Sequence, residues 1–286
     1  MLVIKKIRDI VYLIKKIKLK NKKISFIPTM GNIHKGHISL IKLGKTYSDI
    51  VIVSIFVNVI QFESKKDFIR YPRTLNKDIN TLKKNLVDII FCPNEKSMYK
   101  NLKDYKTFVN VYKYTDILEN KKNKNHFRGV TTILTKLFNI VTPNFVVFGE
   151  KDYQQLLIVK KLVKDLNYDI KILSSPIVRD KNGLALSSRN NFLIKEEKDK
   201  ATEVYKLLKN YSSIIENSKN IEKLNKILKK IRKKLLKKNI KILLLEIKDL
   251  YDLSNITKNT KKAIILVVFK IRNIKLIDNI KLNLSF

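Results

Sequence analysis

The sequence is poor in cysteine and in long apolar runs, and both scarcities exclude classes of protein. Cys92 is the only cysteine among 286 residues, so no intramolecular disulfide can form, which indicates a reduced, cytosolic setting. The longest uncharged runs, Ile50–Phe62 and Leu137–Gly149, are too short to span a bilayer. Charges interrupt the N-terminus every few residues, unlike a signal peptide. We therefore expect a cytoplasmic protein with neither a membrane segment nor an export signal.

Acidic residues are also scarce. The chain has 25 Asp and Glu against 61 Lys and Arg, which gives a net charge of +36 and would ordinarily suggest nucleic acid or an anionic surface as partner. Only eight of these cations are arginine, however, and the lysines are spread along the whole chain. Nucleic-acid binding needs clustered cations with interleaved aromatic residues, and no such patch stands out. We interpret the charge as compositional drift and expect no specific nucleic-acid partner.

Histidine and glycine are rare, and the few that occur lie in a small number of short stretches. All three histidines fall there, together with five of the six glycines: His34, His37, His126, Gly31, Gly36, Gly129, Gly149 and Gly183. Glycine at such places usually supplies a positive φ or lets a ligand approach the backbone. Because the composition disfavours these residues, the stretches that keep them are the first candidates for a site.

One of these stretches is Phe26–Leu40, where a β-branched apolar run breaks at Pro28 and restarts as a helix. It predicts a strand, a loop and a helix. His34 and His37 lie where the loop enters the helix, so backbone N–H groups and imidazole donors can converge on an anion. The alternative is two ordinary surface histidines. We favour a phosphate site, because two of only three histidines lie here.

The periodicity up to about residue 175 alternates between helix and buried strand. A helix is expected over residues 3–18, another to about Lys45, and another over Leu75–Lys84. The expected strands are Ile24–Ile27, Asp49–Asn58, Val87–Phe91, Thr107–Val111, Phe145–Phe148 and Asp169–Leu173. Continuous apolar strands indicate a parallel sheet covered on both faces. We therefore predict an α/β fold with a Rossmann-like nucleotide-binding domain over residues 1–175.

Beyond residue 175 this alternation stops. Helices are expected over Glu196–Asn217 and Ile221–Lys238, followed by the strands Ile242–Ile247, Ala263–Ile271 and Ile274–Leu282. We predict that residues 176–286 form a smaller α+β domain that closes over the active site.

Polar residues follow several of the expected strands. Ligands of parallel α/β sheets bind beyond the carboxyl ends of strands, and Asn58 and Gln61 lie there. A glutamine offers both donor and acceptor, which suits a substrate with hydroxyls and a carboxylate, although a loop-capping amide is equally compatible. Lys151 can neutralise phosphate, and Gln155 could face Gln61 across a substrate. The hydroxyl pair and arginine of 187–189 suit β- and γ-phosphates.

The spacing His34-x-Gly36-His37 resembles the His-x-Gly-His signature of the nucleotidyltransferase superfamily that includes class I aminoacyl-tRNA synthetases. The neighbouring Pro28-Thr29-Met30-Gly31 and Ser39-Leu40 narrow the resemblance to the pantothenate synthetase (pantoate–β-alanine ligase) family. Val57–Phe62 resembles that family's Val-Asn-Pro-x-Gln-Phe motif, with Val59 in place of proline. Phe148–Gln155 resembles its Phe-Gly-x-Lys-Asp-x-Gln-Gln segment without departure. The resemblance covers most of residues 24–193.

This resemblance implies ATP-dependent condensation of (R)-pantoate with β-alanine, through a pantoyl-adenylate, to pantothenate, AMP and diphosphate. It implies His37 and His34 as catalytic residues, and pantoate held by Gln61, Gln155 and Asn58. The implied ATP-binding residues are Met30, Gly31, His34, His37, Gly149, Glu150, Lys151, Asp152, Val178, Leu186, Ser187, Ser188 and Arg189. Mg²⁺ would be held mainly by the ATP phosphates, with Asp78 as a candidate ligand. The resemblance also implies that the protein forms a homodimer. Another His-x-Gly-His nucleotidyltransferase, which would lack the paired glutamines, is the main alternative, and a basic nucleic-acid-binding protein is the other.

Overall fold

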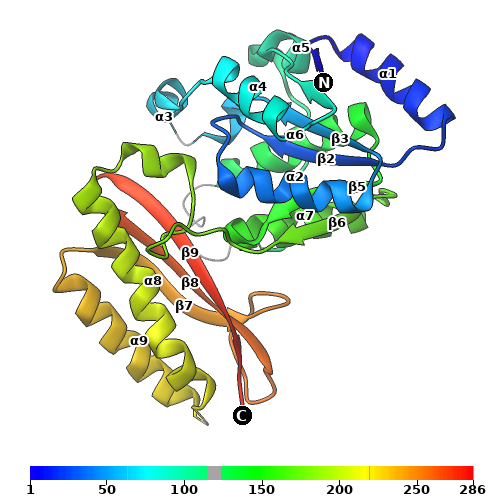
Figure 1. Cartoon of the computed structure of the whole chain (residues 1–286). Coiled ribbons are helices and arrows are strands. Elements are labelled where there is room, and N and C mark those ends of the chain that lie inside the picture. Colours follow the sequence, from blue (N-terminus) through cyan, green and yellow to red (C-terminus); the bar gives the residue numbers. More distant parts are fainter. Residues whose placement is uncertain (63, 115–123, 219, 286) are drawn as a thin grey trace. The chain divides into compact units, whose positions relative to one another are not determined.

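The structure is a computed structural model that describes residues 1–62, 64–114, 124–218 and 220–285. The chain divides into two compact units (Figure 1). Unit 1 contains most of the chain up to Pro176. Unit 2 contains the chain from Ile177 onward together with the segment Lys151–Leu157. Each unit is described by itself below.

Unit 1 is built on a six-stranded sheet in which every neighbouring pair is parallel. Its strands lie in the order β1-β4-β3-β2-β5-β6. Their bounds are β1 Leu2–Ile4, β2 Ile24–Thr29, β3 Ile50–Ile55, β4 Ile89–Phe91, β5 Phe145–Gly149 and β6 Lys171–Ser175. Four consecutive residues of β2, Ile24 to Ile27, are fully buried, as expected for a strand covered on both faces.

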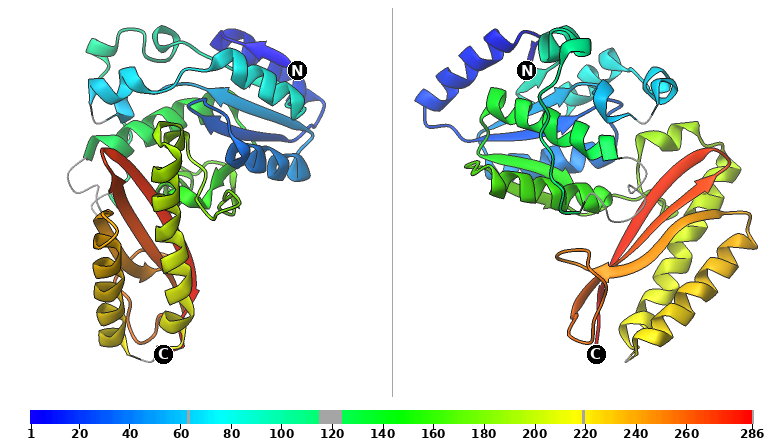
Figure 2. Two further views of the ribbon diagram at one scale, coloured as in Figure 1. Left: turned by 60° about the vertical axis from the view of Figure 1, so that its left-hand side comes forward. Right: turned by 180° about the vertical axis from the view of Figure 1, so that it is seen from behind.

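Helices connect these strands and cover the sheet. They are α1 Ile7–Leu19, α2 Lys35–Tyr47, α3 Lys65–Arg70, α4 Leu75–Lys84, α5 Glu95–Tyr99, α6 Lys124–Val141 and α7 Tyr153–Asp165. α2 lies on one face, where Leu40 and Ile41 pack with Leu82 of α4 against the strands. α6 lies on the opposite face (Figures 1 and 2). Among the described residues, every helix is too short or too polar to span a membrane.

The chain order reverses direction in the sheet between β2 and β5. β2 pairs with β3 along its whole length, from Ile24 to Thr29, but with β5 only at Ser25 and Phe26. Pro28, which has no backbone N–H, follows the point where this second pairing stops. In open parallel sheets ligands bind at such a switch point, outside the carboxyl ends of the strands. We therefore expect a ligand to bind at the loops after β2 and β5.

Unit 2 contains an antiparallel sheet of three strands with two helices on one face (Figure 2). Its elements are α8 Lys195–Glu216, α9 Ile221–Leu236, β7 Lys241–Asp249, β8 Lys262–Ile271 and β9 Ile274–Asn283. Buried apolar side chains of both helices and all three strands form one core. Arg179 donates to both carboxylate oxygens of Asp278 at 2.6 and 2.8 Å and stacks on the Tyr205 ring, 3.7 Å from its centroid. This contact ties the loop after Ile177 to β9.

The predicted fold class is confirmed: a parallel α/β sheet, then a small C-terminal antiparallel sheet with its helices. The predicted boundary at residue 175 stays a prediction. Two local predictions are wrong. Val3 and Ile4 lie in β1, not in the first helix, which begins at Ile7. Thr107–Val111 forms no strand, because Val109 bonds through its backbone to the hydroxyls of Thr131 and Thr132 in α6.

Cys92 follows β4 and lies buried, which generates a prediction about its reactivity. Burial raises the pKa of the Cys92 thiol from 9.0 to about 11, although Lys5 opposes the rise. The thiolate fraction at pH 8 is then about a hundredfold smaller than that of an ordinary thiol, and the thiolate is the reactive species. We expect a disulfide reagent such as DTNB to leave the native protein unmodified at pH 8 and to label one thiol in guanidinium. Rapid labelling of the native protein would contradict this burial.

Candidate active site

The loop after β2 turns sharply through two residues with positive φ. Gly31 has φ +83° and Asn32 has φ +52°. Thr29 supports the turn, since its hydroxyl donates to Ser54 O at 2.7 Å and accepts from Gly31 N–H at 3.1 Å. A Cβ at residue 31 would lie 3.0 Å from Asp78 Oδ2 and 3.2 Å from Ile55 Cγ2. Glycine is therefore required here for both conformation and space.

Asp78 of α4 holds this loop through hydrogen bonds from its carboxylate. Its Oδ2 accepts from Asn32 N–H at 2.9 Å and from the Thr74 hydroxyl at 3.1 Å, and its Oδ1 accepts from Ile33 N–H at 2.8 Å. The residue is only 1% exposed. Backbone N–H groups bonded to a buried carboxylate form strong, charge-assisted contacts. These contacts favour a loop-holding role for Asp78, and the metal role predicted for it stays a prediction.

His34 and His37 cap α2 reciprocally. His34 Nδ1 accepts from Gly36 N–H at 3.1 Å, and His37 Nδ1 accepts from His34 N–H at 3.3 Å. A ring nitrogen that accepts a hydrogen bond carries no proton, so in each neutral imidazole the proton lies on Nε2. The rings lie together, with centroids 4.1 Å apart. The helix start thus fixes two imidazole rings side by side as Nε2–H donors.

The start of α2 favours an anion for a second reason. A helix N-terminus carries partial positive charge, and the first turn of α2 contains no acidic residue. Ser39 anchors this turn at the end of the sheet, since its hydroxyl donates to Gly36 O at 2.7 Å and lies 3.2 Å from Ser175 Oγ at the end of β6. The imidazole donors and the helix dipole therefore both favour a negatively charged ligand.

Gln61 and Asn58 follow β3, and their side chains are joined. Asn58 Nδ2 donates to Gln61 Oε1 at 2.9 Å and to Gly129 O at 3.1 Å. Gln61 Nε2 donates to Met30 Sδ at 3.0 Å, which links this pair to the His loop. Asn58 is 1% exposed, whereas Gln61 is partly exposed. The contacts favour Gln61 as the residue that meets a ligand and Asn58 as its support.

Helix α6 packs closely on the backbone of Gln61. A Cβ at Gly129 would lie 2.6 Å from Ile60 O and 2.8 Å from Gln61 Cα. His126, one turn earlier, bonds Gln61 O through Nδ1 at 2.6 Å; a carbonyl only accepts, so this nitrogen carries the proton. These contacts give His126 and Gly129 a positioning role. Arg128 stacks on Phe108, 4.4 Å from the ring centroid.

The loop after β5 carries the next group of predicted residues. A Cβ at Gly149 would meet only Leu40 Cδ2, at 3.9 Å, so the packing does not require glycine there. Glu150 accepts from the Ser174 hydroxyl at 3.3 Å. Lys151, Asp152 and Gln155 belong to unit 2, where Lys151 O accepts from Asn279 Nδ2 at 3.0 Å. Of these three side chains Asp152 is exposed and the other two are partly exposed.

The remaining predicted residues lie together in unit 2. Leu186 N–H donates to Val178 O at 3.0 Å, which closes a tight hairpin over 178–186. Ser187 caps the 3-10 turn Ser188–Phe192 by accepting from Arg189 N–H at 3.2 Å. Arg189 Nη1 also donates to Lys275 O of β9 at 3.2 Å. Val178 and the 186–189 segment therefore form one local group, and their predicted contacts with ATP stay predictions.

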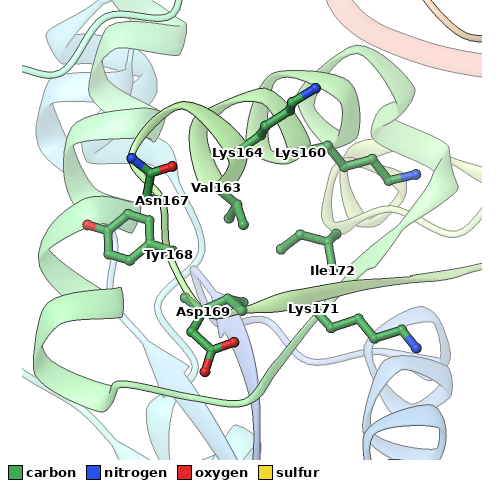
Figure 3. A pocket seen from close by; sticks show the side chains of 9 residues that line it. Lys160, Val163, Lys164, Asn167, Tyr168, Asp169, Lys171 and Ile172 are labelled. Atoms are coloured by element: carbon green, nitrogen blue, oxygen red, sulfur yellow. The ribbon is translucent and has the colours of Figure 1, made fainter.

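A surface depression lies elsewhere in unit 1. It measures about 620 Å³ and is lined by the end of α7 and the start of β6, among them Lys160, Lys164, Tyr168 and Lys171 (Figure 3). This is the amino end of β6, opposite to the carboxyl ends that carry the predicted residues. No predicted site residue lines it. The hydrogen-bond donors suited to an anion lie instead at the His loop.

Unit 1 thus brings Met30, the His pair, Gln61 and Asn58 together beside the switch point. The roles of all these residues stay predictions. The sequence analysis missed Tyr99, whose hydroxyl donates to Asn58 Oδ1 at 2.5 Å. The sequence offers no signal that separates it from Tyr105, Phe108, Tyr112 and Tyr114 in the same lysine-rich segment. The parallel sheet, its switch point and the imidazole-capped helix define an α/β protein of the nucleotide-binding class.

Comparisons with known proteins identify the family. A family model described as pantoate-beta-alanine ligase matches residues 2–281. The pantothenate synthetase of Wigglesworthia glossinidia brevipalpis is 49% identical over 288 residues, which cover 99% of this chain and 100% of the relative. The chain therefore belongs to the pantoate–β-alanine ligase family.

Solved structures agree with this assignment. The pantothenate synthetase of Thermus thermophilus has a TM-score of 0.90 and 31% identity, and the match covers 98% of this chain and 99% of that one. The Francisella tularensis pantoate-beta-alanine ligase, complexed with beta-gamma ATP and beta-alanine, has a TM-score of 0.82 and 34% identity, covering 98% and 97%. The family predicted from the sequence motifs is confirmed.

The Asp78 contacts generate a prediction. In Asp78→Asn one oxygen becomes an amide nitrogen, so at least one of the two loop N–H groups loses its acceptor. We expect the free energy of unfolding to fall by about 1–3 kcal/mol and kcat/KM to fall because the histidines shift. Thr74→Val, which removes only the 3.1 Å contact to Oδ2, should have a smaller effect.

Denaturant unfolding and steady-state kinetics over a series of Mg²⁺ concentrations would measure this effect. A loop-holding residue changes kcat/KM at saturating Mg²⁺ and leaves the half-saturating Mg²⁺ concentration alone. Unchanged stability with a raised Mg²⁺ requirement would instead make Asp78 a metal ligand.

Proposed function

We propose that this protein catalyses the ATP-dependent condensation of pantoate with β-alanine to pantothenate, AMP and diphosphate. The observation that carries the proposal is the reciprocal cap of α2, which fixes the Nε2–H donors of His34 and His37 at a helix start beside the switch point. Membership of the pantoate–β-alanine ligase family supports it, as does the relative complexed with beta-gamma ATP and beta-alanine.

The first step joins pantoate to the nucleotide. A pantoate carboxylate oxygen attacks the α-phosphorus of ATP, the bond to the bridging oxygen breaks, and diphosphate leaves with the bonding electrons. Negative charge grows on the bridging and non-bridging oxygens during this in-line displacement. The Nε2–H groups of His34 and His37, with the N-terminus of α2, stabilise that charge, since fixed donors need no reorganisation at the moment of reaction.

The second step forms the amide. The neutral amine of β-alanine attacks the acyl carbonyl of the adenylate, the bond to the AMP oxygen breaks, and the amine nitrogen loses a proton. AMP is a good leaving group, so the protein needs mainly to hold the two reactants together. Gln61 presents Nε2–H to an acceptor oxygen of pantoate, and Gln155 is proposed to bind the same substrate.

We also propose ATP contacts for residues of each unit. Met30, Gly31, Gly149 and Glu150 of unit 1 are proposed to contact ATP. The corresponding group of unit 2 is Lys151, Asp152, Val178, Leu186, Ser187, Ser188 and Arg189. The cations Lys151 and Arg189 would neutralise phosphate charge, and the serine hydroxyls would donate to phosphate oxygens.

Mg²⁺ is proposed to accompany ATP. Among the described residues no group of three or more His, Cys, Asp or Glu side chains is placed to hold a metal ion, and both Asp78 oxygens already accept hydrogen bonds. This fits an ion that is held mainly by phosphate oxygens, where it would neutralise charge on the departing diphosphate. A homodimer and a cytoplasmic location stay predictions.

The proposed stepwise reaction can be tested by isotope exchange. ATP and pantoate alone should support exchange of labelled diphosphate into ATP, because the adenylate forms before β-alanine reacts. Replacing pantoate by another hydroxy acid is the matched control, and it should abolish the exchange. A nucleotidyltransferase with a different substrate would instead show no exchange with pantoate. Exchange that required β-alanine would overturn the free-standing adenylate. The absence of both exchange and pantothenate formation under every condition would overturn the proposed function.

His37 provides a second prediction. His37→Ala removes a donor to phosphate oxygen, so kcat should fall about 10²–10³-fold with little change in the KM for ATP. His37→Gln keeps an N–H donor and should recover part of the loss, with thermal unfolding as a check that α2 remains folded. A raised KM for ATP at unchanged kcat would make His37 a ground-state binding residue.

A further inference from the structure

Tyr99 lies at the end of α5 and is almost completely buried, with 3% of its surface exposed. Its hydroxyl donates to Asn58 Oδ1 at 2.5 Å, a short hydrogen bond. Its ring packs against Phe56 and Tyr105, with centroids 6.1 and 5.0 Å away. A phenol buried this deeply contacts no substrate, so its effect on the reaction must act through Asn58.

The direction of each hydrogen bond around Asn58 follows from one group. Gly129 O is a backbone carbonyl and can only accept, so the atom of Asn58 facing it must be the amide nitrogen. The amide oxygen of Asn58 then faces Tyr99, which must donate. The second hydrogen of the same nitrogen points to Gln61, which must present its oxygen, Oε1.

This chain of bonds settles the orientation of the Gln61 amide as well. With Oε1 turned to Asn58, Nε2 is the atom on the side of Met30 and the His loop. Gln61 therefore meets a ligand as a donor, and the ligand atom facing it must be an acceptor, such as a carboxylate or hydroxyl oxygen. A reversed Gln61 amide would present an acceptor and repel the same oxygen.

We propose that Tyr99 is a positioning residue for pantoate: its hydroxyl locks the Asn58 amide, which in turn fixes Gln61 as a hydrogen-bond donor toward the substrate. This inference rests on the proposed function and adds a specificity-determining residue outside the site's own surface. Without the Tyr99 hydroxyl, the buried Oδ1 of Asn58 lacks its donor, and the amide gains freedom to rotate away from Gly129 O and Gln61.

Burial keeps the Tyr99 hydroxyl a donor near neutral pH. Burial raises the pKa of the Tyr99 hydroxyl well above its ordinary value, and the neighbouring Tyr105 and Glu95 raise it further. The hydroxyl therefore keeps its proton near neutral pH and donates to Asn58 there.

The test compares two phenylalanine variants of neighbouring tyrosines. Tyr99→Phe should raise the KM for pantoate about tenfold, as expected if the released Gln61 loses its hydrogen bond to the substrate, and should change the KM for ATP less than twofold. Tyr105→Phe is the matched control, because its ring packs against Tyr99 while its hydroxyl is not bonded to Asn58. It should leave both KM values close to those of the wild type.

Asn58→Asp supplies a second variant if Tyr99→Phe folds poorly. It keeps the acceptor for Tyr99 but has no N–H to give Gln61, so it should reproduce the loss for pantoate while ATP binds normally. Equal losses for both substrates, or unchanged kinetics in Tyr99→Phe, would overturn the inference while wild-type activity stands. A wild type without pantoate-dependent diphosphate exchange would overturn the proposed function, and the inference with it.

Discussion

The contact on which the site depends is the one between the buried Asp78 carboxylate and the two backbone N–H groups of Asn32 and Ile33. The chain must leave β2 and enter α2 through two residues of positive φ, a conformation that L-residues rarely adopt. Asp78 supplies acceptors that hold this turn closed. Because the turn ends at His34, the same contact determines where the cap of α2 begins and where both imidazoles lie.

Two sets of donors are thereby fixed within unit 1. Nδ1 of His34 and His37 accepts backbone N–H groups, which leaves the proton on Nε2. Around Gln61 the fixed point is Gly129 O, from which the orientations of Asn58 and then Gln61 follow. Donors that the protein's own hydrogen bonds already hold in place need little free energy of reorganisation when charge develops nearby. This arrangement suits a reaction in which the protein positions reactants and stabilises phosphate charge.

The sequence predicted the parts of this account that local patterns encode. The apolar strands, the helix at Leu75–Lys84 and the strand–loop–helix around His34 have strong periodicity or distinctive residues. The three-residue strand β1 was missed because Val3 and Ile4 also fit the helical period that starts at Ile7. Asp78 and Tyr99 act through contacts with residues 32, 33 and 58, far away in sequence. Such pairings depend on tertiary packing, which periodicity alone does not reveal.

The central claim is that the protein fixes the imidazole protons before any substrate binds, and NMR can test it directly. The chain has only three histidines, so long-range ¹H–¹⁵N correlation spectra of histidine-labelled, ligand-free protein can identify the tautomer of each ring. We predict Nε2–H for His34 and His37, and Nδ1–H for His126, which serves as the internal contrast because it donates to Gln61 O. Neutral His34 or His37 rings carrying the proton on Nδ1 would contradict the account.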